Sequence, residues 1–330
     1  MAKGYGKPYP NGAWTKRQRE AVGQPKGRTS MNRRNFSKTL AGATLGTAAL
    51  ALEPLATAAR AAADQSPVET PFKISIMLWT VLHELPFEER LEKMAEAGYH
   101  AVELVGEYAK WTEDEFRRYN KKRVELGITF DTTAGTRHGA GDPKVRDAFL
   151  ADIREQLEIM KKIECPALIV MSGNVVPGLS PQTQHDSCVE GLKRAAELVE
   201  GKGVTLLLEN IDLEENPHYY MWSVPEAFKI IEEVNHPQVK FLYDFYHAQI
   251  SGGNLIANLQ RHVDKVGLIH IADVPGRHEP GTGEINYINI YKKLAELNYN
   301  RYVAMEFRPS GDVVKTLARA RMEALQAARG

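Results

Sequence analysis

Four polar side chains lie at or next to the ends of four apolar segments in the second half of the chain: Glu209, Asp244, His270 and Glu306. Carboxylate oxygens with one imidazole nitrogen form a ligand set that suits Mn²⁺, Mg²⁺ or Co²⁺ better than a structural zinc ion. Such chemistry requires a fold that brings these side chains together.

Short apolar runs rich in strand-forming residues alternate with longer amphipathic stretches from Phe72 onward. The runs predict eight strands, over Ile74–Trp79, Ala101–Val105, Ile128–Thr132, Ala167–Met171, Thr205–Glu209, Lys240–Asp244, Val266–Ile271 and Tyr302–Phe307. The amphipathic stretches predict helices that include Thr112–Glu125, Pro143–Lys162, Pro181–Glu200, Pro225–Val234 and Val313–Ala328. Three of these helices open with proline, and Thr112 with Glu115 predicts a capping box.

Eight strand and helix repeats over about 250 residues match the length of a (β/α)8 TIM barrel, whose catalytic groups lie at the C-terminal ends of its strands. The alternative is a doubly wound open sheet, which usually carries a glycine-rich phosphate loop after its first strand. The nearest such segment is Gly281-Thr282-Gly283, but Glu284 follows it and no third glycine completes the motif. The sequence therefore predicts a barrel over residues 72–330 and no nucleotide cofactor.

The alternation of side chains along a strand predicts which of them face the barrel interior. In the last predicted strand Val303, Met305 and Phe307 share the outward face, so Glu306 points inward. The same reasoning turns the other three candidates inward: Glu209, Asp244 and His270. Three buried carboxylates repel one another unless a cation compensates them. Four protein ligands would leave about two octahedral positions open for substrate oxygens.

Taken singly, each candidate has an ordinary structural explanation. A carboxylate at the end of a strand often caps a helix or pairs with an arginine, and a lone histidine is often a hydrogen-bonded core residue. The convergence of four such side chains on one mouth of the barrel is what favours a metal site.

The composition limits the classes of protein that fit. With 330 residues, 43% of them hydrophobic, the chain can form a sizeable core. Residues 64–330 hold 31 Lys and Arg against 40 Asp and Glu, a net charge of −9. This acidic body disfavours nucleic-acid binding, which depends on neutralising phosphates. Cys165 and Cys188 are the only cysteines, so neither a disulfide framework nor a cysteine-built zinc site is expected, and both are predicted to be buried thiols.

The N-terminal region predicts export. Arg33 and Arg34 precede an uncharged stretch of about 13 residues, Leu40–Leu52, which is too short for a membrane-spanning helix. Small residues follow it and end at Ala61-Ala62-Ala63, as at a signal-peptide cleavage site. The segment around the two arginines resembles a twin-arginine signal, although Asn32 and Ser37 depart from its usual pattern. We therefore expect an exported, periplasmic protein with a signal peptide over 31–63 and no membrane anchor after cleavage. Residues 1–30 are expected to be disordered or untranslated.

Longer motifs carry a family resemblance. Four segments resemble the hydroxypyruvate isomerase family within the xylose isomerase-like barrels: Leu207-Leu208-Glu209-Asn210, Tyr243-Asp244-Phe245-Tyr246-His247-Ala248-Gln249, the stretch from Ile269 to Glu284, and Met305-Glu306-Phe307. The resemblance runs from about Phe72 to the C-terminus. It implies metal ligation by Glu209, Asp244, His270 and Glu306, with Glu209 and Glu306 as the proton-transferring pair. Some hydroxypyruvate isomerases carry Gln where this chain has His270, whereas the related ketose 3-epimerases carry His.

Loop residues add groups that would bind a substrate. Arg277 would hold a carboxylate in bidentate fashion, or else pair with Glu279 or a helix end. His247 would donate a hydrogen bond to a carbonyl oxygen, or else bond Glu209 or Glu215. Aromatic walls of the pocket, or core residues, are predicted in a further set: Trp79, Tyr246 and Trp222.

These expectations together describe a divalent-metal-dependent isomerase, with a small molecule as substrate, that converts hydroxypyruvate to tartronate semialdehyde through an enediolate. The alternatives are a ketose 3-epimerase, a 2-oxo-tetronate isomerase and, more distantly, an endonuclease of the same barrel class. The non-enzyme alternative is an exported sugar-acid binding protein. The sequence is compatible with a homo-oligomer.

Overall fold

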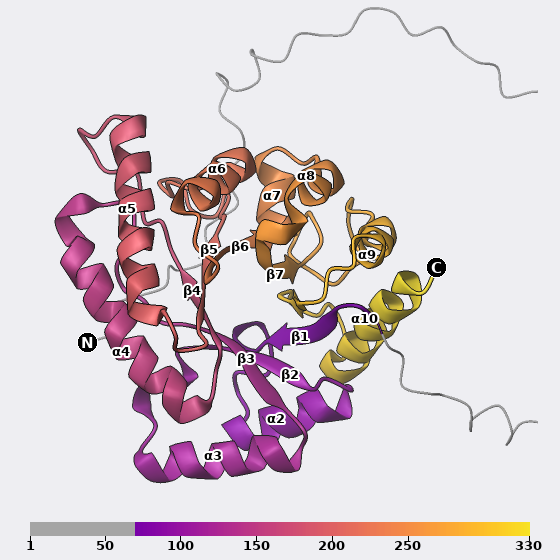
Figure 1. The fold of residues 1–330 in the computed structure, drawn as a ribbon. Coiled ribbons are helices and arrows are strands. Elements are labelled where there is room, and N and C mark those ends of the chain that lie inside the picture. Colours follow the sequence, from indigo (N-terminus) through magenta and orange to yellow (C-terminus); the bar gives the residue numbers. More distant parts are fainter. Residues whose placement is uncertain (1–69) are drawn as a thin grey trace, which may run out of the picture. The chain divides into compact units, whose positions relative to one another are not determined.

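The computed structural model describes residues 70–330, so the predicted leader over 31–63 and the extension over 1–30 lie outside the described residues. Eight parallel strands pair in sequence order and close on themselves (Figure 1). Their bounds are β1 Lys73–Met77, β2 Ala101–Val105, β3 Thr129–Ala134, β4 Ala167–Val170, β5 Thr205–Glu209, β6 Val239–Asp244, β7 Val266–Ile271 and β8 Tyr302–Met305. The barrel predicted from the sequence is confirmed, and the doubly wound alternative is wrong because β8 pairs with β1.

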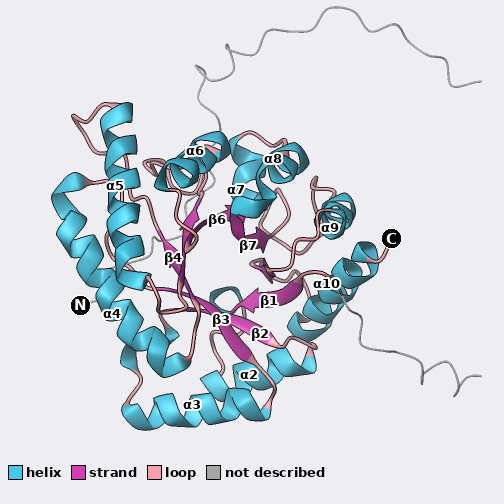
Figure 2. Ribbon diagram, viewed as in Figure 1, coloured by secondary structure: helices cyan, strands magenta, loops and turns pink. Residues whose placement is uncertain are grey.

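Helices surround the strands, as Figure 2 shows in cyan against magenta. The α-helices are α2 Phe87–Glu96, α3 Glu113–Glu125, α4 Arg146–Ile163, α5 Pro181–Val199, α6 Val224–Val234, α7 Phe245–Ser251, α8 Leu255–His262, α9 Tyr287–Glu296 and α10 Val313–Ala328. Short 3₁₀ turns are η1 Leu78–Thr80, η2 Glu107–Lys110, η3 Pro143–Val145 and η4 Val263–Lys265. Among the helices of residues 70–330, none combines the length and apolarity that a bilayer crossing requires.

Local sequence signals account for several helix ends. Thr112 caps α3 with the predicted capping box, in which its side chain accepts from the Glu115 N–H and the Glu115 carboxylate accepts from the Thr112 N–H. Ser180 caps α5, and Pro181 occupies the first turn, where its missing N–H costs no hydrogen bond. These local choices orient the helices that pack on the barrel.

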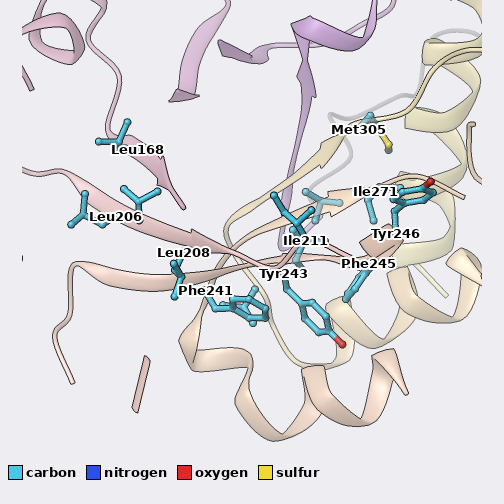
Figure 3. Packing of buried hydrophobic residues seen from close by; sticks show 14 of the residues in the cluster. Leu168, Leu206, Leu208, Ile211, Phe241, Tyr243, Phe245, Tyr246, Ile271 and Met305 are labelled. Carbon is cyan, nitrogen blue, oxygen red and sulfur yellow. The ribbon is translucent and has the colours of Figure 1, made fainter. Parts of the chain in front are cut away.

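The core has two parts, one on each face of the strands. Outside the strands, alternate residues pack against the helices, and Figure 3 shows Leu206, Leu208, Phe241, Tyr243 and other members of this cluster. Inside the barrel lies a smaller apolar cluster: Met77, Ile169, Leu207, Leu242, Leu268 and Ala304. The inward and outward side chains predicted for the last four strands are therefore confirmed. Because this interior cluster is apolar, a polar side chain inside the barrel needs a specific partner or a function.

Some strand bounds differ from the prediction. β1 stops at Met77, because Leu78–Thr80 turns into a 3₁₀ helix. β8 stops at Met305, although the Glu306 N–H still donates to the carbonyl of Ile271 at 2.9 Å. Glu306 thus keeps its inward position by one hydrogen bond to β7 after the strand pairing has ended.

Both cysteines are buried and free of disulfide bonds, as expected. Burial raises the pKa of the Cys188 thiol to about 12, so it carries no thiolate at neutral pH. Cys165 is likewise buried, and its pKa is raised by the same cause. The two residues act as small apolar core groups.

A buried histidine joins α5 to α6 and predicts a pH-dependent stability. His185 is 1% exposed, and its two ring nitrogens lie 2.6 Å from Glu226 Oε1 and 3.0 Å from Glu233 Oε2. Burial alone would lower the pKa of His185, but the two glutamates outweigh burial and raise it. The stabilisation is therefore complete below the unfolded pKa of about 6.5 and is lost as the pH rises through the folded pKa.

We expect His185→Gln to cost about 1–2 kcal/mol of unfolding free energy at pH 6, because two charge-assisted hydrogen bonds are weakened and both glutamates are partly solvent-screened. The cost should shrink at pH 9. Chemical denaturation at both pH values measures it, with the exposed His83→Gln as control. A cost that grows with pH would contradict the assignment.

Candidate active site

Four side chains converge at the C-terminal mouth of the barrel from four adjacent strands. Glu209 ends β5, Asp244 ends β6, His270 lies in β7 next to its end, and Glu306 directly follows β8. One ligand atom of each lies within 4.8 Å of those of the other three. All four side chains are buried. The structure thus brings together the four residues that the sequence singled out.

The cluster holds polar atoms that lack partners, which tests its fit to a metal ion. Among the described residues, Asp244 Oδ2, His270 Nδ1 and Glu306 Oε2 are buried without a hydrogen bond. His270 Nδ1 lies 2.9 Å from Glu306 Oε2, 3.6 Å from Glu209 Oε1 and 3.9 Å from Asp244 Oδ2. Unsatisfied buried acceptors are costly. Carboxylate oxygens and an imidazole nitrogen gathered in this way fit a divalent cation.

The pKa values of these groups show how strongly they act on one another. Burial raises the pKa of Asp244 to about 6. Burial would also raise the pKa of Glu306, but the positive charges of Arg277 and His270 outweigh burial and hold this pKa well below its usual range. Burial would lower the pKa of His270, whereas Glu103 and Glu306 raise it well above its ordinary value. Positive charge is therefore strongly stabilised at this mouth.

Arg277 reaches the cluster from the loop after β7. Its guanidinium lies 2.8 Å from Glu306 Oε1 and 2.7 Å from Glu215 Oε2. Its Nε is buried without a hydrogen bond to any residue of 70–330. The guanidinium lies over the rings of Trp79 and Tyr246, with its carbon 5.4 and 5.0 Å from their centroids. In the described part of the chain, Arg277 makes no ion pair with Glu279, the alternative partner.

His247 follows Asp244 by three residues, in the first turn of α7. Its Nδ1 hydrogen-bonds Asp212 Oδ2, and its Nε2 lies 3.6 Å from Asp244 Oδ2. Burial would lower the pKa of His247, but Asp244 and Asp212 raise it. Asp212 thus takes the place of the expected alternative partners, Glu209 and Glu215. The sequence prediction missed Asp212. The feature that could have revealed it is a second carboxylate only three residues after Glu209.

The predicted aromatic walls divide into two groups. The Trp79 Nε1–H donates to Glu306 Oε1 at 2.9 Å, and the Tyr246 hydroxyl donates to Glu215 Oε1 at 2.9 Å. These two rings therefore border the site and also fix its carboxylates. Trp222 is 40% exposed, which excludes the core-packing role for it.

The loop that presents Arg277 is organised by Asp273. This buried carboxylate accepts four backbone N–H bonds, from Val274, Gly281, Gly283 and Ile285. The Arg277 N–H donates to the carbonyl of Asp273, and the Arg277 carbonyl accepts from Arg308. Gly276 and Arg277 have φ of 98° and 57°. A compact loop of this kind holds the guanidinium in place with few degrees of freedom.

Gly283 allows the close approach on which this loop depends. A Cβ at that position would lie 2.0 Å from the Val274 carbonyl oxygen and 2.6 Å from Asp273 Oδ1. We expect Gly283→Ala to cost about 1–3 kcal/mol of unfolding free energy, as overpacking usually does. Gly311→Ala is the control, because its Cβ would meet only Thr316 Oγ1 at 3.7 Å. Denaturant titration of both variants checks this, and equal stability of the two would contradict it.

The chain matches a known family model. The model described as xylose isomerase-like TIM barrel matches residues 91–327, which include all four clustered side chains. The chain belongs to this family. Within the family, hydroxypyruvate isomerase from Escherichia coli (strain K12) is 32% identical over 246 residues, covering 72% of this chain and 93% of that protein. A 2-oxo-tetronate isomerase from Pectobacterium atrosepticum is 30% identical over 244 residues, with coverage of 72% and 93%.

Solved structures agree on the fold of this xylose isomerase-like barrel. A crystal structure from Brucella melitensis, described as an AP endonuclease of family 2, matches with a TM-score of 0.70 and 27% identity over 76% of this chain and 98% of that one. D-psicose 3-epimerase from Clostridium cellulolyticum H10 matches at 0.65 and 20% identity, over 78% and 98%, and this shows the fold alone. The predicted family resemblance and the aldose–ketose isomerase class are confirmed at the level of the family.

Proposed function

We propose that this protein is a divalent-metal-dependent isomerase that acts on a small keto-hydroxy acid, most like the conversion of hydroxypyruvate to tartronate semialdehyde. The observation that carries the proposal is the buried cluster with three unpartnered ligand atoms, from Asp244, His270 and Glu306. Its two glutamates stand on β5 and after β8, on either side of the other two ligands. Binding alone does not need such a pair, which favours an enzyme over an exported binding protein.

The metal ligands in this proposal are Glu209, Asp244, His270 and Glu306. A bound Mn²⁺, Mg²⁺ or Co²⁺ would supply positive charge beside adjacent carbonyl and hydroxyl oxygens of the substrate and so acidify the neighbouring C–H bond. The two glutamates then need only ordinary basicity, since the C–H bond is already activated.

The proton transfers fall to Glu209 and Glu306. With hydroxypyruvate, one glutamate removes a proton from the hydroxymethyl carbon, and the C–H electron pair becomes the carbon–carbon double bond of an enediolate. Negative charge moves to the former carbonyl oxygen. A glutamate then returns a proton to the former carbonyl carbon, and the proton of the neighbouring hydroxyl passes to the former carbonyl oxygen. The product is tartronate semialdehyde, with no redox change overall.

Two loop residues would orient the substrate. The unpartnered Nε of Arg277 supports a role in binding a substrate carboxylate. His247, held through Nδ1 by Asp212, presents its Nε2 toward the carboxylate cluster, where it can donate to an oxygen that gains negative charge. Both side chains are buried, so their hydrogen bonds act in a medium of low dielectric.

A second candidate function is supported by His270. By the resemblance drawn from the sequence, ketose 3-epimerases carry His at this position where some hydroxypyruvate isomerases carry Gln. An epimerase would invert the carbon next to the carbonyl and leave the carbonyl in place, whereas an isomerase transfers the proton between the two carbons. A 2-oxo-tetronate isomerase would share the isomerase outcome on a longer substrate, in line with the Pectobacterium relative.

The experiment that tests the proposal is an assay of the protein with hydroxypyruvate, a 2-oxo-tetronate and a panel of ketoses, with Mn²⁺ added and products followed by NMR. We expect carbonyl transfer in a keto-hydroxy acid. Inversion of a ketose without carbonyl transfer would favour the epimerase. Turnover of no member of the panel by protein loaded with stoichiometric metal would contradict the proposal.

We also propose that residues 31–63 direct export by the twin-arginine route, on the paired Arg33 and Arg34 and the apolar stretch after them. Export of a folded chain would allow metal loading in the cytoplasm before transport. Replacement of both arginines by Lys, followed by cell fractionation, tests this. Unchanged export of that variant would contradict the proposed route.

A further inference from the structure

A buried glutamate inside the barrel, Glu103, takes no part in the proton transfers or metal ligation proposed above. Glu103 lies in the middle of β2, where Val102 and Leu104 face the outer apolar cluster and Glu103 faces the interior. It is 0% exposed. A carboxylate in such a place costs free energy unless another group compensates it.

The compensating group is His270, on the far side of the barrel. Glu103 Oε2 lies 3.0 Å from His270 Nε2, although 167 residues separate them and β2 and β7 are not neighbours in the sheet. The contact therefore crosses the interior rather than following from strand pairing. Because burying the Glu103 carboxylate costs free energy, the presence of this contact indicates that the orientation of the His270 ring matters.

The two ring nitrogens of His270 face different partners. Nε2 meets the Glu103 carboxylate, whereas Nδ1 points to the cluster, with Glu306 Oε2 at 2.9 Å and Glu209 Oε1 at 3.6 Å. An ionised carboxylate only accepts hydrogen bonds, and carboxylates face both nitrogens. With the oxygens of Glu306 and Glu209 turned to a cation, the proton of a neutral imidazole would sit on Nε2, against Glu103. The lone pair on Nδ1 is then available to a cation.

We propose that Glu103 is a positioning residue of the metal site: it accepts the Nε2–H of His270, fixes the tautomer and the ring angle, and so directs Nδ1 at the cation. This inference rests on the proposed function. Glu103 would thus act on the metal site only through His270, without contacting the cation or the substrate itself. Carboxylate partners of this kind also strengthen the donor character of the imidazole.

A second interior carboxylate provides a matched control. Asp131, in β3, is as buried as Glu103, but its Oδ1 accepts from Ser75 Oγ at 2.6 Å and its Oδ2 lies 3.3 Å from Thr132 Oγ1. No hydrogen bond joins Asp131 to His270 among the described residues. Asp131→Asn therefore removes a buried carboxyl group from the same interior without removing an acceptor from the imidazole.

The test is titration of the metal-free protein with Co²⁺, measuring the Kd by calorimetry and the visible absorption of the bound ion, in wild type, Glu103→Leu, Glu103→Gln and Asp131→Asn. We expect about a 10–100-fold weaker Kd and an altered spectrum for Glu103→Leu. Glu103→Gln, which keeps an acceptor, should fall between Glu103→Leu and wild type, and Asp131→Asn should stay near wild type. Circular dichroism confirms that each variant is folded.

The outcomes separate this inference from the function on which it rests. Wild-type protein that binds no Co²⁺ would overturn the proposed function. Wild type that binds Co²⁺, with the same Kd and spectrum in folded Glu103→Leu and Glu103→Gln, would overturn the role of Glu103 alone. A Kd that weakens equally in Asp131→Asn would also overturn it, because loss of any buried carboxyl group from the interior would then explain the effect.

Discussion

Replacement of Glu306 by Gln is expected to lower kcat by about 10³-fold or more, because an amide neither takes up nor returns the proton and is a poor metal ligand. The fold should survive, since Gln has nearly the same size and the position lies just beyond β8. The environment is specific for a carboxylate: Trp79 donates to Oε1 at 2.9 Å and Arg277 lies 2.8 Å from the same atom. An amide nitrogen placed there would face two donors.

Steady-state kinetics of Glu306→Gln, with a thermal melt of the same sample, measures this loss. The control is Glu226→Gln, which removes a carboxylate of the α5–α6 contact with His185 and lies outside the proposed catalytic groups. It should lose stability and keep its kcat. A Glu306→Gln protein with nearly normal turnover would remove Glu306 from the mechanism.

Removal of divalent metal is expected to abolish turnover, and addition of Mn²⁺, Mg²⁺ or Co²⁺ should restore it. The reason is the set of buried, unpartnered atoms on Asp244, His270 and Glu306, which protein groups alone leave unsatisfied. Because a cation that binds only the folded chain stabilises it, metal at about 100 times its Kd should add about 2.7 kcal/mol to the free energy of unfolding.

Dialysis against a chelator, followed by activity and denaturation measurements with and without each metal, checks both parts. Calcium serves as the control ion, because it prefers more oxygen ligands than this cluster offers. Full activity in protein from which the metal has been removed, verified by elemental analysis, would contradict a metal-dependent reaction.

The candidate cluster could be predicted because each of its residues sits on or beside a strand whose outward face is clearly apolar. In β5, for example, Leu206 and Leu208 pack outward, which leaves Glu209 one orientation once the strand is recognised. The order of eight repeats then places the ends of β5 to β8 at one mouth. The alternation of apolar residues along each strand and the barrel fold were therefore sufficient to predict the cluster.

The partners of the cluster could not be predicted in the same way. Glu103 meets His270 across the barrel, and that contact depends on the shear of the closed sheet, including a register shift between Val102 and Glu103. Asp212 meets His247 from a loop after β5 whose path depends on contacts remote in sequence. Such pairings follow from three-dimensional closure, which strand periodicity does not encode.

The surroundings of Arg277 show a similar limit. Its type and its place after β7 predict a role at the mouth, but its partners depend on a loop folded around Asp273 with left-handed backbone at Gly276 and Arg277. Sequence proximity suggested Glu279 as a partner. That glutamate instead accepts hydrogen bonds from Ser310 and Arg319, which ties the loop to α10.

Solvent exchange tests the central claim, metal-dependent enolisation at this cluster, most directly. The protein is incubated in D₂O with hydroxypyruvate, a 2-oxo-tetronate and ketoses, with Mn²⁺ or after chelation, and NMR is recorded after the metal has been removed. In at least one substrate, we predict either deuterium at a carbon next to the carbonyl or migration of the carbonyl with transfer of the proton. Both signals should disappear on chelation and in the Glu306→Gln variant. Absence of both exchange and product with every substrate, in protein that holds one metal per chain, would contradict it.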